Sequence, residues 1–316
     1  MKFKAPKWLA AAPVAAVLAI TLSACGGGTS ASSSPTDALK GADQQSTDKY
    51  TTASVTPLDK IDTSKLGLIT PGVIKVGTLS DAPPNIYIDN KGNFTGYDNE
   101  LLRAMAAKLG LKVEFASTKF QSLLAQVANK QFDMGSSSIS TTDARRQTVG
   151  FTNGYDFGYM AIVTKQGATV KSFDDLKQGV RIGVVQGTVQ DDFVTNTLKL
   201  DPVRFPDYNT VYANVKSGQI DAWVAPSQQA EGAVKPGDGT TIAQKKVNTQ
   251  NFTAYAVAKG NQPLIDALNS ALDAVIADGT WSKLTAQWYP DRPTLKEQTP
   301  DGWKPGSKAV QVPAAK

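Results

Sequence analysis

The folded region of the chain begins with short β-branched runs separated by helical stripes. The apolar runs predict strands over Val73–Gly77, Leu111–Phe115 and Phe132–Ser136. After Asp98, apolar residues recur every three or four positions, so we expect Asp98 to cap a helix that Gly110 ends. A second helix is expected around Leu123–Val127. Strands joined by single helices predict parallel pairing with right-handed crossovers.

The same rhythm restarts after Ser172. Further strands are predicted over Val180–Val185, Ile220–Val224 and Ala254–Lys259, and helices over Phe173–Gln178, from Thr188 onward, over Pro263–Asp278 and over Thr280–Trp288. No sequence repeat accompanies this restart. The order of the elements nevertheless predicts an α/β fold built as two successive units.

The N-terminal segment has the layout of a secretory signal peptide. Three lysines and no acid precede an apolar run from Trp8 to Leu22, and the tetrapeptide LSAC, which ends at Cys25, resembles the bacterial lipobox. This resemblance implies cleavage before Cys25 and acylation of its thiol, which would hold the chain on the outer face of a membrane. The alternative is a buried free cysteine in a short transmembrane anchor. However, the apolar run of about 15 residues is shorter than the ~20 residues that span hydrocarbon.

The charge balance argues against nucleic acid as a partner. The full chain has 33 basic and 28 acidic residues, a net charge of +5. Three of the lysines precede Cys25 and would leave with the signal peptide, so the exported chain carries 30 basic and 28 acidic residues, or +2. This near balance removes most of the case that a basic chain makes for a polyanion-binding protein.

Missing residue types exclude several chemistries. The chain has no histidine, which excludes Ser-His-Asp and Cys-His catalysis and every histidine-ligated metal site. Cys25 is the only cysteine, so no intramolecular disulfide forms and the fold depends on its hydrophobic cores. The sequence has no calcium-loop spacing, and it implies no metal and no cofactor.

The two ends of the chain differ in composition from the middle. Residues 25–57 are Gly, Ser, Thr, Ala, Asp and Gln with little to bury, which predicts a flexible tether after a signal peptide over residues 1–24. Residues 298–316 are rich in Pro, Gly and Lys and predict a surface tail.

Four segments follow one another at characteristic separations. They are GYDNELLRAMAAKLG (Gly96–Gly110), DMGSSSISTTDAR (Asp133–Arg145), GVVQGTVQDDF (Gly183–Phe193) and DGTWSKLTAQWY (Asp278–Tyr289). Together they resemble the bacterial family 3 solute-binding proteins, the polar-amino-acid receptors of ABC importers. The resemblance covers nearly all of the chain from Pro71 to Tyr289. One departure within the first motif is Asn99, where the family usually has an aliphatic residue.

This resemblance implies an α/β, two-lobed fold of the periplasmic-binding-protein kind, type II. Each lobe would be a mixed, mostly parallel sheet flanked by helices, and two extended hinge strands would join the lobes near Ala161–Lys165 and Thr253–Ala258. The C-terminal helices would return to the first lobe. We therefore expect lobe 1 over residues 58–163 and 254–297 and lobe 2 over residues 164–253.

The resemblance also places a ligand between the lobes. Arg145 aligns with the arginine that holds the ligand's α-carboxylate in the family, and its planar guanidinium can meet both carboxylate oxygens. Ser138 and Ser140 stand where the family offers hydroxyl and backbone N–H groups to the same carboxylate. From lobe 2, Thr188 lies at a helix start, where N–H groups favour an anion, and Gln190 would reach in from the same turn.

Several of these candidates also have a plainer interpretation. Phe120 occupies the place where family members stack an aromatic ring on the ligand, and core packing is the alternative. Trp223 lies in a predicted buried strand and favours the core, whereas Tyr155 fits hinge packing and cleft lining equally well. For the polar candidates the alternatives are a solvated basic pair for the arginine and simple capping roles for the serines and the threonine.

Two departures from the family pattern bear on the ligand. Ala82 stands where many members carry a first aromatic lid. Pro226, five residues after Asp221, stands where the family places an aspartate for the α-ammonium, and proline offers neither a side-chain acceptor nor an N–H. A buried, unpaired ammonium is strongly unfavourable. Asp81 is a candidate replacement. Otherwise the ligand lacks a free α-ammonium and is a carboxylic acid, a betaine-like amine stacked on Phe120, or a modified amino acid.

These inferences predict a non-catalytic receptor on the extracytoplasmic face of the cell membrane. We expect a lipid-anchored monomer that captures a small carboxylate-bearing solute by lobe closure and delivers it to ABC permease subunits. Two alternatives stay open. One is ligand sensing without transport, and the other is a cyclic-acid dehydratase on the same fold, for which the chain offers no clear acid–base pair.

Overall fold

The computed structural model describes residues 58, 61–289 and 305–306. The predicted signal peptide, the lipidation site at Cys25 and the tether over residues 25–57 lie outside these residues, as does most of the predicted tail. No helix among the described residues has both the length and the apolar character needed to cross a membrane.

The first lobe is built on the predicted strand–helix alternation. Strand β1 (Val73–Thr78) lies between β5 (Lys112–Ser117) and β6 (Met134–Ser140), and it pairs with both in parallel. Helices α1 (Tyr97–Lys108) and α2 (Phe120–Ala128) make the two connections. The three predicted strands, the two helices and the parallel pairing are confirmed.

A small antiparallel sheet is inserted between β1 and α1. It consists of β2 (Asp81–Ala82), β3 (Ile86–Ile88) and β4 (Phe94–Thr95). The sequence pattern did not predict it, because strands of two or three residues are too short to show a period of two.

The second lobe repeats the arrangement. Strand β9 (Ile182–Val185) pairs in parallel with β10 (Val203–Phe205) and β11 (Ala222–Pro226), and the helices are α4 (Val189–Asp192), α5 (Tyr208–Ser217) and α6 (Ser227–Ala233). Helix α4 continues as a π-helix over Phe193–Thr197. The predicted helix over Phe173–Gln178 is wrong, because only a 3-10 turn forms over Phe173–Asp175 and the chain is already extended at Leu176.

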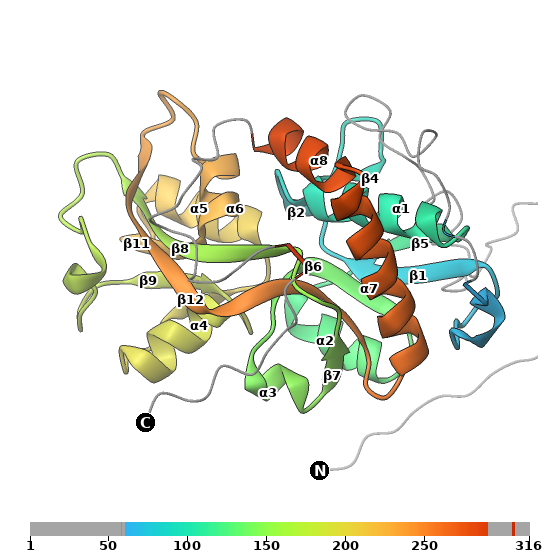
Figure 1. Cartoon of the computed structure of the whole chain (residues 1–316). Helices are drawn as coiled ribbons and strands as arrows, with labels where there is room; N and C mark the ends of the chain where they lie inside the picture. The colour runs from blue at the N-terminus through green and yellow to red at the C-terminus, as the bar shows by residue number, and fades with distance from the viewer. Residues whose placement is uncertain (1–57, 59–60, 290–304, 307–316) are drawn as a thin grey trace, which may run out of the picture.

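Two long strands carry the sheet from one lobe to the other. Strands β8 (Asp156–Lys165) and β12 (Thr240–Ala258) pair antiparallel, giving the strand order β10-β9-β11-β8-β12-β6-β1-β5, with β7 (Val149–Phe151) paired to β12. Both strands run through the middle of the molecule in Figure 1.

The passage between the lobes lies earlier along each strand than the expected hinge ranges. Residues 161–164 already pair with β11 in the second lobe, and residues 253–257 already pair with β6 in the first. The chain therefore crosses between lobes near Asp156–Met160 and between Val247 and Thr253.

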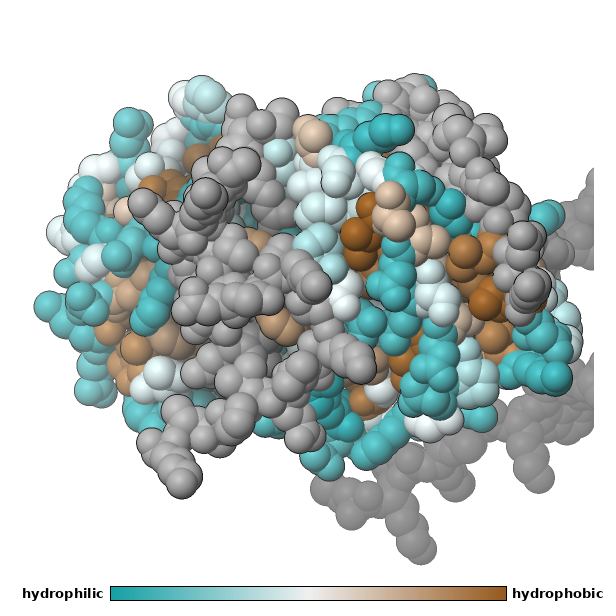
Figure 2. All heavy atoms as spheres, in the orientation of Figure 1, coloured by the Kyte–Doolittle hydropathy of each residue, from teal (hydrophilic) through white to brown (hydrophobic). Residues whose placement is uncertain are grey.

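The C-terminal helices lie on the first lobe. Helices α7 (Gln262–Ala277) and α8 (Thr280–Trp288) pack against α1, and Leu101, Leu268 and Leu284 belong to one core. Figure 1 shows these helices, at the red end of the colour scale, on the same half of the molecule as α1 and the blue strand β1. In Figure 2, hydrophobic side chains on the coloured part of this face form separate patches among hydrophilic ones, since most apolar stripes turn inward.

Candidate ligand-binding site

A cavity that is partly open to solvent lies between the two lobes. The first lobe contributes Phe120, Ser137, Ser138, Ser140 and Arg145; the second contributes Thr188, Val189, Gln190, Tyr208, Pro226, Gln228 and Gln229; and the connecting strands contribute Gly158, Tyr159 and Thr253. All the predicted ligand residues except Asp81 are among those lining it.

Arg145 spans the boundary between the lobes. It sits on the short helix α3 (Asp143–Arg146), which Thr142 caps by accepting from the Arg145 N–H at 3.2 Å. The guanidinium donates from Nη1 to the Ser140 carbonyl at 2.9 Å and from Nη2 to the Gly187 carbonyl, in the second lobe, at 3.2 Å. Removal from water lowers the pKa of Arg145 to about 10, so the group stays charged at neutral pH.

Phe120 lies against this cation. The first residue of α2, it is 6% exposed, and the Arg145 guanidinium carbon lies 5.0 Å from the centroid of its ring. The ring therefore packs both into the core and onto the arginine, which holds the guanidinium at the cavity wall.

Ser138 directs its donors away from the cavity. Its backbone has a φ of 45°, and both its N–H and its hydroxyl donate to Asp98 Oδ2, at 2.6 and 2.8 Å. Its hydroxyl accepts from Asn85 Nδ2 at 2.7 Å. The expectation that Ser138 offers these groups to a ligand therefore differs from the geometry, because Asp98 already accepts them.

Asp98 is the buried anchor beneath this wall. The prediction that Asp98 caps helix α1 is wrong, because Gly96 occupies the N-cap position. The Asp98 side chain turns inward instead and accepts from Ser138 and from the Tyr155 hydroxyl, the latter at 2.8 Å. Burial raises the pKa of Asp98 to about 7 against the opposing effect of these hydrogen bonds.

Tyr155 is fully buried and stacks on Tyr255, so it supports the site from behind and does not line the cavity. Trp223 is likewise fully buried in the core.

In the second lobe, Thr188 forms the sharp turn that leads from β9 into α4. Gly187 has a φ of 78°, in the left-handed region that favours glycine. The Thr188 hydroxyl donates to the Val185 carbonyl at 2.7 Å and accepts from the Asp191 N–H at 3.2 Å. Thr188 therefore caps this short helix, as its alternative interpretation predicted, while also lining the cavity beside Gln190.

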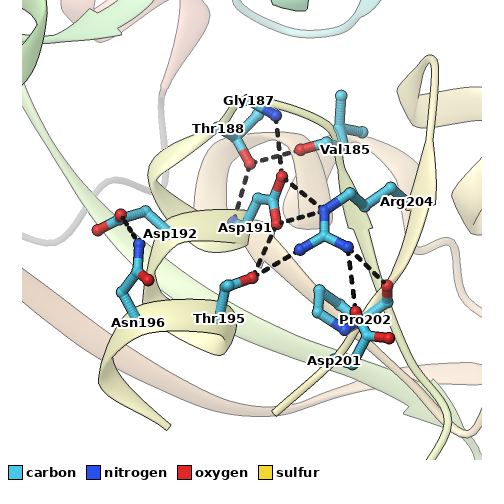
Figure 3. Close-up of polar contacts among 10 residues, drawn as sticks. All are labelled: Val185, Gly187, Thr188, Asp191, Asp192, Thr195, Asn196, Asp201, Pro202 and Arg204. Carbon is cyan, nitrogen blue, oxygen red and sulfur yellow. Dashed lines mark hydrogen bonds and ion pairs between the residues drawn. The ribbon is translucent and has the colours of Figure 1, made fainter. Parts of the chain in front are cut away.

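An ion pair that the sequence analysis missed supports this turn. The Asp191 carboxylate accepts from the Gly187 N–H at 3.1 Å and from Arg204 Nε at 3.0 Å, and Thr195 connects the two side chains (Figure 3). Arg204 comes from β10, so the contact joins the turn to the sheet. The only local signal was an acid three residues after a helix cap, a common capping arrangement.

Asp81 lies at the edge of the interface between the lobes. From β2 in the first lobe, its Oδ2 accepts from the N–H groups of Tyr208 and Asn209, at 2.8 and 3.3 Å, at the start of α5 in the second. Burial raises its pKa. Close by, a Cβ added to Gly232 of α6 would lie 2.0 Å from the Pro83 carbonyl oxygen, so the lobes meet here without room for a side chain.

Pro226 borders the cavity at the start of α6, followed by Gln228 and Gln229, which are 6% and 3% exposed. Both glutamines, as well as Tyr159 and Tyr208, were not predicted from the sequence, because no local pattern marked any of them as a cavity residue. Within the described part of the chain, no group of three or more acidic, histidine or cysteine side chains is arranged to hold a metal ion.

Comparisons with known proteins agree with this geometry. The family model for bacterial extracellular solute-binding proteins, family 3, matches residues 74–291. The L-cystine-binding protein TcyJ of Escherichia coli (strain K12) is 28% identical over 221 residues, which are 69% of this chain and 83% of that protein. The ABC transporter arginine-binding protein 1 of the same strain is 28% identical over 222 residues, 69% and 90% of the two chains.

Solved structures are similar over the same region. An ancestral arginine-binding protein bound to arginine aligns with a TM-score of 0.66 at 31% identity and covers 69% of this chain and 98% of its own. The ancestral amino acid-binding protein AncCDT-1, a precursor of cyclohexadienyl dehydratase, aligns with a TM-score of 0.63 at 29% identity, covering 69% and 95%. These likenesses confirm the predicted two-lobed type II fold.

Proposed function

Because the chain belongs to the bacterial extracellular solute-binding proteins, family 3, we propose that it is the extracytoplasmic receptor of an ABC importer. It captures a small carboxylate-bearing solute, an amino acid or a derivative, between its lobes and delivers it to the permease subunits. The receptor is a monomer, and acylated Cys25 anchors it to the outer face of the cell membrane.

The observation that carries this proposal is the position of Arg145. Its two Nη groups donate to neutral carbonyl oxygens, one in each lobe, and Arg145 lines the cavity between the lobes. An entering carboxylate would accept from the same fork, and a hydrogen bond between two ionised groups is stronger than one to a neutral carbonyl.

Closure follows from the division of the site between the lobes. Ser140, Phe120 and Arg145 belong to the first lobe, and Thr188 and Gln190 to the second. A ligand held by both sets gains contacts only when the lobes are together, so its binding shifts the molecule toward the closed state.

The role we propose is binding without catalysis. Both bacterial relatives named above are binding proteins. Arg145 is the one charged side chain among the described residues of the lining, and a guanidinium does not give up its proton in general acid–base chemistry.

Titration calorimetry with amino acids and organic acids tests the proposal. We expect to find a ligand whose affinity falls by about 100-fold in Arg145→Ala, because the mutation removes a charged partner of a buried carboxylate. The matched control is Arg146→Ala, since Arg146 is absent from the lining and packs on Phe151. Equal affinity of wild type and Arg145→Ala for that ligand would overturn the assignment.

A further inference from the structure

The cavity carries one positive charge and, among the described residues that line it, no negative one. Arg145 supplies the positive charge, and its guanidinium donates hydrogen bonds to two carbonyl oxygens. An amino acid zwitterion would bring both a carboxylate for Arg145 and an ammonium that needs an acceptor. An anionic ligand without an ammonium group would need no such acceptor.

Asp81, Glu231 and Asp98 contact lining residues from outside the cavity, and each is engaged there. Asp81 accepts from the backbone of α5, and Glu231 accepts from the Tyr159 hydroxyl at 2.9 Å and from Lys245 Nζ at 2.6 Å. Asp98 is 0% exposed, with three hydrogen bonds at Oδ2 and a buried Oδ1. Asp98 is fully buried and is not among the residues that line the cavity.

The part of the wall beside Pro226 is built from neutral amides. Gln190, Gln228 and Gln229 are 5%, 6% and 3% exposed and all line the cavity. The Gln229 Oε1 atom is buried and has no hydrogen-bond partner among the described residues. Amides donate and accept hydrogen bonds without charge, so they suit a hydroxyl, oxo or amide substituent better than an ammonium.

Phe120 does not favour a cationic ligand either. Its ring already has the Arg145 guanidinium 5.0 Å away. A quaternary ammonium stacked on this ring would lie close to a like charge in a partly dehydrated site, which disfavours a betaine-like ligand.

We propose, on the basis of the function proposed above, that the ligand is a small carboxylic acid without a free ammonium. It is a net anion, such as a 2-hydroxy, 2-oxo or N-acylated acid. Its carboxylate binds Arg145, and its neutral polar substituent binds the glutamine amides. The site therefore selects against the free amino acids that the names of the relatives suggest.

Matched ligand series test this selection. The twenty amino acids, their N-acetyl derivatives and their 2-hydroxy counterparts are titrated into the full chain by calorimetry after a thermal-shift screen. We expect the best acid to bind at least about tenfold more tightly than its amino counterpart. An amino acid that binds as tightly as or more tightly than its acid counterparts, with binding still lost in Arg145→Ala, overturns this inference and leaves the proposed function standing. Binding in none of the series overturns both.

Pro226→Asp sharpens the test, with Pro226→Asn as its neutral control. Pro226 is the N-cap of α6, where Asp and Asn are both favoured, so each variant is expected to fold. Pro226→Asp introduces a carboxylate at this wall. It should lower the affinity for acids and raise the affinity for amino acids, each by about tenfold, whereas Pro226→Asn should keep the wild-type preference for acids. Gln229→Glu, which keeps the side-chain shape, should act in the same direction as Pro226→Asp. If Pro226→Asp and Gln229→Glu both keep the wild-type preference, the selection does not depend on charge at this wall and the inference is wrong.

Discussion

The two lobes have similar topologies but hold their charges differently. On α1 in the first lobe, Glu100 and Arg103 are 0% and 5% exposed and form an ion pair at 3.0 Å. In the second lobe, the ion pair between Arg181 and Asp221 has side chains 52% and 37% exposed. Of these two pairs, only the first is sealed from water.

This difference indicates unlike roles at the cavity. Removing one member of a buried pair leaves an uncompensated charge, whereas the members of an exposed pair are solvated with or without each other. Beside the buried pair, Asp98 fixes Ser138 in the cavity wall. Buried charges therefore form the platform beneath Ser138 in the first lobe, whereas the second lobe contributes the turn at Thr188 and the glutamine amides.

The largest expected effect comes from breaking the buried pair. Glu100 also accepts from the Thr95 hydroxyl at 2.8 Å, so Glu100→Ala leaves both Arg103 and Thr95 without this acceptor. We expect a loss of about 3–5 kcal/mol in the free energy of unfolding, measured with chemical denaturant. Asp221→Ala is the matched change in the second lobe and should be hard to separate from wild type. Similar losses from the two variants would contradict the contrast between the lobes.

The pH dependence of stability tests the same platform. Burial raises the pKa of Asp98 from 3.8 to about 7, and the charge of Asp156 adds to the rise. Between pH 4 and 7 the unfolded carboxyl is ionised while the folded one keeps its proton, so raising the pH through this window lowers the free energy of unfolding. The contribution of Asp98 to the free energy of unfolding is fully present below pH 4 and is lost above pH 7. For a pKa shift of this size it is at most about 4 kcal/mol.

Asp98→Asn should flatten that slope. The amide cannot ionise and still offers an oxygen to Ser138 and Tyr155. Denaturant unfolding at a series of pH values from 4 to 8 measures the difference. Some slope should persist, because burial also raises the pKa values of Asp81 and Asp133. A variant with the full wild-type slope would show that Asp98 does not titrate in this window.

The elements that the sequence predicted well are those with a local period. The strand at Val73 and the helix over Thr280–Trp288 show it clearly, and the structure has both. Helix α5 was missed because polar residues dilute its stripe, although Asp207 caps it and Gly218 ends it in the left-handed conformation. Local pattern also misassigned Asp98 as a cap, since its true partners stand 40 and 57 residues away.

The order of the family motifs along the chain predicted part of the candidate site, but not the contacts between residues far apart in the sequence. The family motifs identified Arg145, Ser140, Thr188 and Gln190, which the structure places around one cavity; their binding roles stay predictions. The motifs carry no information on which groups meet across the lobes. The position of Asp81 at the start of α5 depends on a contact between residues 127 positions apart, and no spacing in the sequence encodes it.

Asp81 offers the smallest effect and the finest test of how the lobes divide their work. Two carboxylates serve the start of α5: Asp207 accepts from the Thr210 N–H within the second lobe, and Asp81 accepts from Tyr208 and Asn209 across the interface. Only the second contact requires the lobes to be closed. Losing a helix cap costs about 0.5–2 kcal/mol, so Asp81→Ala should weaken ligand binding about fivefold by destabilising the closed state.

The pattern across ligands separates this role from the ammonium acceptor that the sequence suggested. A contact between the lobes contributes to closure around any ligand. Asp81→Ala should therefore lower the affinities for acids and for amino acids by the same factor, as measured by calorimetry. Lys119→Ala is the control, because its contact with Asp207 also joins the lobes but is a surface ion pair with the lysine 54% exposed. A loss confined to amino acids would instead mean that Asp81 turns from α5 to the ligand, and the second lobe would then close over a charge that the first lobe supplies.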